Sequence, residues 1–188
     1  QEYTQESGQP LAFTLLTDST NAGVLQAQFL KSQWEAAGAK VTIKQEDQGA
    51  QIADAVTGQY QATTWGQFGS PDPDYDYVWW ISDNAAPTGK LGLNIARNKD
   101  PQIDAALNAA RATTDPKVRA DSYATVAKRL NEDLPYIWLA RGRYVQMSTN
   151  SVRGLTNGPL PDGEAAYPIG GPGGFGLVTQ LTQTWFDK

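Results

Sequence analysis

The sequence predicts an α/β protein in which a mainly parallel or mixed sheet is flanked by helices. Short apolar runs that suit strands alternate with longer segments of helical spacing, in the order β-α-β-α-β over residues 11–65. Both helical segments begin at polar residues and end at a glycine, Gly38 or Gly58, so the chain itself marks their boundaries. Strands joined in this way run parallel, and ligands of such sheets bind beyond the carboxyl ends of the strands.

The first strand and helix have clear patterns. Residues 11–17 are an apolar run that suits a strand buried on both faces. The polar residues 18–21 then begin a helix over residues 22–37. Apolar side chains lie on two sides of this helix: Leu25, Phe29 and Ala36 on one, Leu30 and Trp34 on the other. A helix that is apolar on two sides is expected to be packed between two layers.

The next three elements complete the first half. Residues 40–44 alternate strictly between polar and apolar, which indicates a strand toward the edge of a sheet. Asp47 suits the N-cap of a helix that Gly58 ends, and residues 60–65 predict a third strand. The segments expected at the carboxyl ends of the three strands are residues 18–21, 45–49 and 66–72.

Two Asp-Pro pairs predict two further helices. Asp100-Pro101 and Asp115-Pro116 each place an aspartate at the N-cap and a proline at the first helical position. The expected buried stripes are Ile103, Ala106, Leu107 and Ala110 in the first helix and Val118, Ser122, Val126 and Leu130 in the second.

The last third of the chain is less regular. Residues 135–140 predict a strand, and residues 143–147 predict its continuation or the return arm of a hairpin. Residues 157–176 are a loop rich in glycine and proline, and residues 177–188 are too short to form a domain. Residues 1–188 are therefore interpreted as a single domain.

Composition excludes several classes of function. The 188 residues are 40% hydrophobic, with a formal net charge of −5 and no block of Lys or Arg, so nucleic acid is not an expected partner. The absence of cysteine and histidine removes thiol nucleophiles, thiolate metal sites and Ser-His-Asp triads. The apolar runs are far shorter than the roughly 20 residues that span a bilayer, and the polar first residues do not form a signal peptide. No metal ion or cofactor is expected.

Residues 65–80 are the strongest candidate for a functional site, because aromatic side chains, glycines and carboxylates crowd behind the third predicted strand. Trp65 offers a surface on which a ligand can stack. Gly66 and Gly69 permit a ligand to approach the backbone closely. The alternative interpretation of all three residues is turn geometry or core packing.

The carboxylates of this stretch have two interpretations. Asp72 and Pro73 suit the N-cap and first position of a helix. The expected buried side of that helix is Tyr77, Trp80 and Ile81. The spacing of Asp72, Asp74, Asp76 and Asp83 imitates a calcium-binding loop, but Tyr77 occupies the position that requires glycine.

Two catalytic or phosphate-binding alternatives are weaker. Paired carboxylates serve as acid and base in glycosidases, but their separation cannot be obtained from sequence and surface carboxylates are common. The glycines of residues 170–176 are not followed by the Lys-Ser/Thr pair of a phosphate-binding loop, so this segment is interpreted as a loop or linker.

The order of these motifs resembles the carboxy-terminal lobe of the family 5 extracellular solute-binding proteins, the peptide- and nickel-type receptors of ABC importers. The likeness extends over about residues 10–155. It is carried by the opening strand with Val24-Leu25-Gln26 to Gly38-Ala39-Lys40-Val41, by Trp65-Gly66 running into Asp72-Pro73-Asp74, by Asn94 to Arg97 before Asp104-Ala105-Ala106-Leu107, and by Arg119 and Tyr123 leading to Asp133-Leu134-Pro135-Tyr136-Ile137.

The resemblance implies one α/β lobe of a two-lobed, periplasmic-binding-protein-like fold that closes on a ligand in the cleft between the lobes. The implied partners are a small-molecule or oligopeptide ligand, the missing amino-terminal lobe of the same receptor and an ABC permease in the membrane. Residues 177–188 would lead toward the missing lobe. Such a receptor is periplasmic or extracellular, with any lipid anchor in the absent amino-terminal part, and it has no catalytic residues.

The ligand-binding residues expected on this basis are Trp65, Gly66, Gln67, Phe68, Gly69, Ser70 and Asp72. Peptide-specific members of the family hold the ligand's α-amino group with an aspartate at the position matched by Gly69. Because Gly69 has no carboxylate, sugars, metal chelates and other uncharged compounds remain candidate ligands alongside peptides. An Asp/Glu-dependent hydrolase of a secreted polymer and a non-catalytic structural or adhesion module remain the alternative functions.

Overall fold

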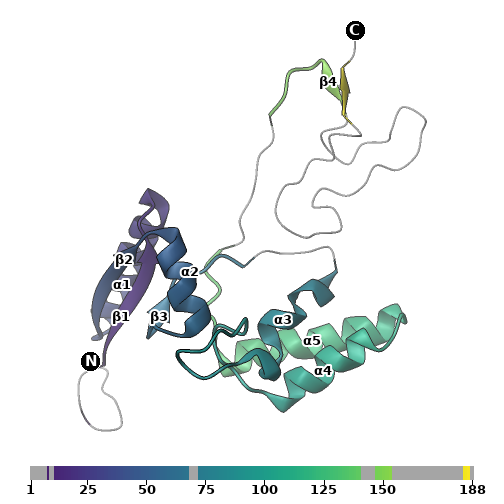
Figure 1. The fold of residues 1–188 in the computed structure, drawn as a ribbon, viewed down its shortest axis with the longest axis horizontal. Coiled ribbons are helices and arrows are strands. Elements are labelled where there is room, and N and C mark those ends of the chain that lie inside the picture. Colours follow the sequence, from purple (N-terminus) through teal and green to yellow (C-terminus); the bar gives the residue numbers. More distant parts are fainter. Residues whose placement is uncertain (1–7, 9–10, 68–71, 141–146, 154–183, 187–188) are drawn as a thin grey trace. The chain divides into compact units, whose positions relative to one another are not determined.

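The computed structural model describes Gly8 and residues 11–67, 72–140, 147–153 and 184–186 (Figure 1). The chain divides into two compact units. One unit contains Gln1–Gly66 and Val78–Ala105, and the other contains Gln67–Tyr77 and Ala106–Lys188. Among the residues that the structure describes, no helix is both long enough and apolar enough to cross a membrane.

The first unit is built on a three-stranded parallel sheet with the strand order β2-β1-β3. The strands are β1 (Ala12–Asp18), β2 (Lys40–Glu46) and β3 (Ala62–Thr63). The predicted β-α-β-α-β order is confirmed, and so is the place of β2 at an edge. The prediction for residues 60–65 is wrong in length, because the ladder between β3 and β1 contains only two residue pairs.

Two helices connect these strands, and their ends follow the predicted local signals. α1 (Asn21–Ala36) begins after Thr20, whose hydroxyl accepts a hydrogen bond from the Gly23 amide. α2 (Gln48–Thr57) begins after its N-cap Asp47. It ends at Gly58, which has the left-handed φ of 72° that favours glycine.

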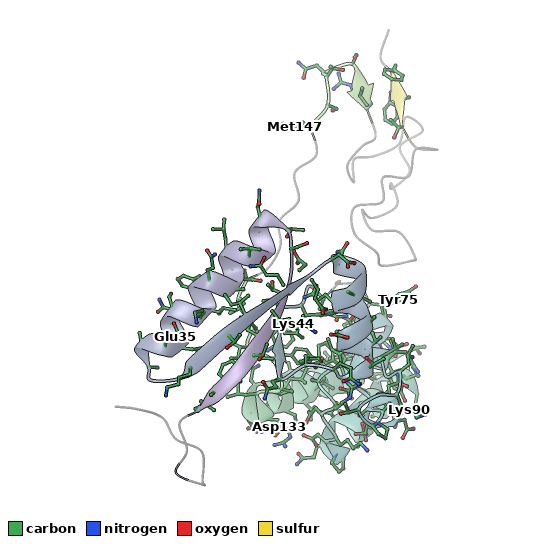
Figure 2. The ribbon with its side chains drawn as sticks, turned by 60° about the vertical axis from the view of Figure 1, so that its left-hand side comes forward. Glu35, Lys44, Tyr75, Lys90, Asp133 and Met147 are labelled. Atoms are coloured by element: carbon green, nitrogen blue, oxygen red, sulfur yellow. The ribbon has the colours of Figure 1, made fainter. Side chains whose placement is uncertain are left out.

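The two helices cover opposite faces of the sheet (Figure 2). Leu30 of α1 packs in one core cluster with Leu15 of β1 and Val41 of β2. On the other face, the Lys44 ammonium of β2 lies 3.0 Å from the Asp54 carboxylate of α2. Successive residues of a strand point to opposite faces, so the odd-numbered residues of β1 face α1 and the even-numbered ones face α2.

The prediction that α1 is packed between two layers is wrong for the residues described. Its Leu30 and Trp34 side contacts the sheet, and the Trp34 ring meets the Phe13 ring edge to face at 5.3 Å. Leu25 and Phe29 on the other side are 66% and 63% exposed. The apolar pattern shows that both sides of α1 carry apolar residues. It does not show whether another element covers the second side.

Within the first unit, the segment Val78–Ala105 is held by side chains that donate to backbone carbonyls. The Asn94 amide donates to the carbonyls of Trp80, Ile81 and Asn98 at 3.2, 3.2 and 2.9 Å. The Arg97 guanidinium donates to the last carbonyls of α2, which favours that helix end because it carries partial negative charge. The Arg97 bonds join α2 to this segment, which carries part of α3 (Tyr77–Trp80) and the 3₁₀ turn η2 (Ser82–Asn84), whereas the Asn94 bonds stay within the segment.

The two predicted Asp-Pro helices are confirmed as α4 (Pro101–Arg111) and α5 (Pro116–Asp133). Asp100 and Asp115 accept hydrogen bonds from the first amides of these helices. The predicted α4 stripe of Ile103, Ala106, Leu107 and Ala110 is buried throughout. In α5, Val126 and Leu130 are buried, but Val118 is 44% exposed, so the first turn of the predicted stripe is wrong.

The predicted strand over residues 135–140 is wrong, because the structure has no ladder there. Ile137, Trp138 and Leu139 are all about half exposed or more. The Trp138 ring stacks on its near neighbour Tyr136 at 5.5 Å. β propensity alone does not form a strand when no partner strand lies alongside it.

Other predictions for the last third fall largely outside the described residues. These are residues 141–146 of the predicted hairpin, the loop of residues 157–176 and most of the segment 177–188. The structure adds a short antiparallel pairing between β4 (Val152–Arg153) and β5 (Trp185–Phe186), which the sequence did not predict.

Candidate ligand-binding edge

The strand order β2-β1-β3 creates one place where the direction of the crossovers reverses. From β1 the chain passes through α1 to β2 on one side, and from β2 it passes through α2 to β3 on the other side of β1. In open α/β sheets, the crevice at such a switch point is where ligands bind, outside the carboxyl ends of the strands. The candidate edge therefore lies between the ends of β1 and β3, at Asp18 and at Thr64 to Gly66.

On the β1 side of this edge, the Asp18 side chain is bonded to the residues that begin α1. The Asp18 carboxylate accepts hydrogen bonds from the amide and the hydroxyl of Thr20. A Cβ added to Gly23 would lie within 2.4 Å of the Asp18 carboxylate, so glycine makes room for that group against the first turn of α1. Asp18 thus orders the start of α1.

The β3 side rests on buried polar contacts. The Thr64 hydroxyl donates to the Thr17 hydroxyl of β1 at 3.0 Å, and the Thr64 carbonyl accepts from the Gln51 side chain of α2 at 2.8 Å. Gln51, Thr17 and Thr64 were not predicted as site residues from the sequence. Thr17 carried a weak signal, because it is a polar residue at the end of a largely apolar predicted strand.

The predicted site residues Trp65 and Gly66 follow Thr64 directly. The Trp65 side chain is partly buried, and Gly66 is exposed. A Cβ added to Gly66 would meet no heavy atom within 4 Å, and Gly66 is not among the described glycines with positive φ. Neither local crowding nor backbone strain therefore requires glycine at this position.

The predicted residues Gln67 and Asp72 belong to the second unit. The Gln67 side chain donates to the Asp76 carboxylate at 3.3 Å. Burial raises the pKa of the Asp76 carboxyl, and the Gln67 hydrogen bond partly opposes that shift. The other predicted residues, Phe68, Gly69 and Ser70, lie outside the described residues, so their roles stay predictions.

The predicted helix start at Asp72 is confirmed. Asp72 is the N-cap of the 3₁₀ turn η1 (Pro73–Asp76), and its Oδ1 accepts from the Asp74 amide at 2.9 Å. The same oxygen lies 2.5 Å from a guanidinium nitrogen of Arg119. The structure thus gives Asp72 a role in ordering the turn, and its role toward a ligand stays a prediction.

A second ion pair orders the same turn. Arg111 binds both carboxylate oxygens of Asp74, with distances of 2.9 Å from Nε to Oδ1 and from Nη2 to Oδ2. The Arg111 guanidinium also lies 3.6 Å from the centre of the Tyr77 ring. Two of the four carboxylates that imitated a calcium loop, those of Asp72 and Asp74, are thus bound to arginines. The described residues hold no group of three metal-ligating side chains.

Two surface hollows of the first unit lie away from the candidate edge. One, of about 330 Å³, is lined by residues that include Thr14, Lys44 and Tyr60, and the other, of about 460 Å³, by residues that include Phe13 and Lys40. Neither is lined by Trp65 or Gly66. We favour the switch point over these hollows because it lies at the carboxyl ends of the strands, where ligands of open α/β sheets bind.

Comparisons with known proteins agree with this fold. No family model matches the chain. Among curated proteins, it is 29% identical over 143 residues to "Di/tripeptide-binding protein 4" of Pseudomonas aeruginosa (strain UCBPP-PA14), a match over 76% of this chain and 26% of that protein.

Among solved structures, DppA of Helicobacter pylori, an ABC transporter-associated periplasmic binding protein in complex with the peptide STSA, matches 95% of this chain and 31% of its own, with a TM-score of 0.66 and 19% identity. NikZ of Campylobacter jejuni in complex with Ni(L-His) matches 70% of this chain and 26% of its own, with a TM-score of 0.60 and 24% identity. The chain therefore spans about a quarter to a third of the length of these relatives.

These matches confirm the predicted α/β fold class and its likeness to one lobe of a periplasmic binding protein. The structural neighbours bind a peptide or a small metal complex, as their descriptions state. Together with the curated relative, they show what the chain is similar to: a di/tripeptide-binding protein in sequence and periplasmic binding proteins in fold.

Proposed function

We propose that this chain is the carboxy-terminal, ligand-binding lobe of an extracytoplasmic receptor that delivers a peptide-like or other small solute to an ABC importer. The observation that carries this proposal is the strand order β2-β1-β3, which puts Trp65 and Gly66 at the switch point between β1 and β3. The likeness to binding proteins for peptides and nickel complexes supports the same function.

In this proposal the lobe forms one wall of a cleft, and the amino-terminal lobe of the same receptor forms the other. The ligand-lining residues are Trp65, Gly66, Gln67, Phe68, Gly69 and Ser70, and Asp72 orders the turn that follows them in the sequence. Trp65 provides a stacking surface and Gly66 leaves the backbone open to contact. Contacts from both lobes exist only in the closed state, so the single lobe binds ligand weakly.

The receptor works in the periplasm or at the cell exterior, with any lipid anchor in its amino-terminal part, and passes its solute to a permease. It is a binding protein without catalytic activity. The chemistry of the ligand stays open between peptides, sugars and metal chelates, because Gly69 supplies no carboxylate for an α-amino group.

A thermal-shift experiment on the whole receptor tests this function. The probes are trialanine, Ni²⁺ with L-histidine, and a trisaccharide, because a compound that binds the native state raises its melting temperature. The expected result is a shift with one class of probe that is lost on Trp65→Ala. Turnover of a peptide or glycoside that is lost on Asp76→Asn would favour the hydrolase alternative, because burial raises the pKa of this carboxyl and a general acid needs such a shift.

A further inference from the structure

Two buried polar side chains, those of Thr17 and Gln51, bond to the buried residue Thr64 beneath the candidate edge. Thr17, Gln51 and Thr64 are 0%, 5% and 8% exposed, and they come from β1, α2 and the residue after β3. A buried polar group is costly unless it is hydrogen-bonded, and each of these three has a partner.

The contacts of Gln51 fall on the last residue before Trp65. Its amide nitrogen lies 2.8 Å from the Thr64 carbonyl and 3.4 Å from the Thr64 hydroxyl. It also lies 3.5 Å from the Thr63 hydroxyl. One side chain of α2 is therefore within hydrogen-bonding reach of the end of β3 at three oxygen atoms.

The end of β3 needs this support because the strand itself is so short. Only Ala62 and Thr63 pair with β1, and one further backbone bond joins the Thr64 amide to the Leu16 carbonyl at 2.9 Å. Two paired residues define the direction of the following backbone poorly, whereas a side-chain bond to the Thr64 carbonyl fixes the peptide that leads into Trp65.

We propose that Gln51 is a positioning residue for the ligand wall formed by Trp65 and Gly66. The inference rests on the proposed function in one respect, namely that Trp65 and Gly66 face the ligand. Gln51 does not touch the ligand. It holds the Thr64 peptide and thereby sets where the indole of Trp65 lies, so that the wall is formed before a ligand arrives.

A ligand-independent experiment tests this role in the 188-residue chain labelled with 5-fluorotryptophan. The ¹⁹F signal of Trp65 is identified by its loss in Trp65→Phe. Gln51→Met keeps the side-chain length and removes the donor, and it is expected to shift or broaden the Trp65 signal more than the other tryptophan signals. Where Gln51→Met does not fold, Gln51→Asn keeps a neutral amide and moves the donor away from the Thr64 carbonyl by one methylene group.

Two control variants separate positioning from general stability. Gln48→Met makes the same substitution at an exposed position of the same helix. Leu30→Val destabilises the core between α1 and the sheet, and Leu30 makes none of the hydrogen bonds of this network. Both are expected to leave the Trp65 signal in place. An unchanged Trp65 signal in folded Gln51→Met, or an equal change in Leu30→Val, overturns the inference.

Affinity in the whole receptor gives the functional readout. With trialanine as probe, Gln51→Met is expected to weaken binding about tenfold, which is the size of effect expected when one hydrogen bond that orders a site is lost. Gln48→Met is expected to leave binding unchanged. Normal affinity in Gln51→Met contradicts the inference while the proposed function stands. If the unaltered receptor binds neither trialanine, the nickel complex nor the trisaccharide, the proposed function fails, and the ¹⁹F comparison alone decides the role of Gln51.

Discussion

Gly66→Ala distinguishes a glycine that a turn requires from a glycine that leaves room for a ligand. The added Cβ meets no heavy atom within 4 Å, and Gly66 is not among the described glycines with positive φ. Replacing such a glycine restricts the unfolded chain, which stabilises a protein by about 0.4–1 kcal/mol. For a chain of this size the melting temperature should rise by about 1–4 °C.

Ligand binding should respond in the opposite direction. If a ligand approaches the Gly66 backbone closely, the methyl group causes overpacking of about 1–3 kcal/mol, which weakens affinity by about five- to 150-fold. Urea unfolding measures the first effect, and calorimetric titration of the whole receptor with the probe that gives a thermal shift measures the second.

Gly58→Ala is the matched control. A Cβ at Gly58 would lie 2.4 Å from Cζ of Arg97, and φ is 72°, so this substitution should lower stability by more than about 1 kcal/mol and leave affinity unchanged in the folded receptor. Reduced stability in Gly66→Ala would show that the turn itself requires glycine. Unchanged affinity in a stable Gly66→Ala receptor would refute the assignment of this backbone to the ligand wall.

Two further predictions concern the acidic turn. Asp74→Asn removes the bidentate pair with Arg111. Because both side chains are partly exposed, the free energy of unfolding in urea titrations should fall by about 1 kcal/mol or less, and the loss should shrink in 1 M NaCl. Asp121→Asn, which breaks a far more exposed pair with Lys117, should lower it by less. Burial raises the pKa of Asp76 above its usual value of 3.8, so the folded state holds this proton more tightly than the unfolded state. The free energy of unfolding should therefore fall as the pH rises from below the usual pKa through the raised pKa of Asp76. Asp76→Asn should flatten this part of the plot of stability against pH. A wild-type plot with no such fall would contradict a raised pKa for Asp76.

Local signals in the sequence predicted helix boundaries well. Asp47, Asp100 and Asp115 each cap a helix because their carboxylates accept from the amides that every helix leaves unpaired. Gly58 ends α2 because it adopts a left-handed φ. These signals depend on a few neighbouring residues, so they can be recognised without knowing the rest of the fold.

Predictions that depended on distant partners were less successful. Leu25 and Ile137 have the pattern of buried residues, and both are exposed in the structure. Hydrophobic periodicity shows which side of an element prefers to be covered, but it does not show whether a covering element is present. The pairing of Val152–Arg153 with Trp185–Phe186 also joins residues far apart in the sequence, and two-residue strands leave no periodicity to detect.

The candidate site was predicted only in part, because some of its contacts also depend on residues far apart in the sequence. Trp65 and Gly66 could be recognised because an aromatic residue and a glycine follow a predicted strand. Asp72 stayed ambiguous until the structure showed Arg119 beside it, 47 positions along the chain. The bond between Thr17 and Thr64 also spans 47 positions, so no local pattern reveals it.

The shortness of β3 connects the fold to the proposed binding wall. Side chains hold this strand at both ends: the Tyr60 hydroxyl donates to the Ile95 carbonyl at 2.5 Å before it, and Gln51 donates to the Thr64 carbonyl after it. The Gln61 side chain also accepts from the Thr14 amide of β1 at 2.8 Å. A long backbone ladder would fix the strand regardless of its side chains, whereas a short strand held by side chains can be repositioned by substituting any one of them. Ligand preference at this edge should therefore be alterable at residues that do not touch the ligand, and Gln51 is the first position at which to look for such a change.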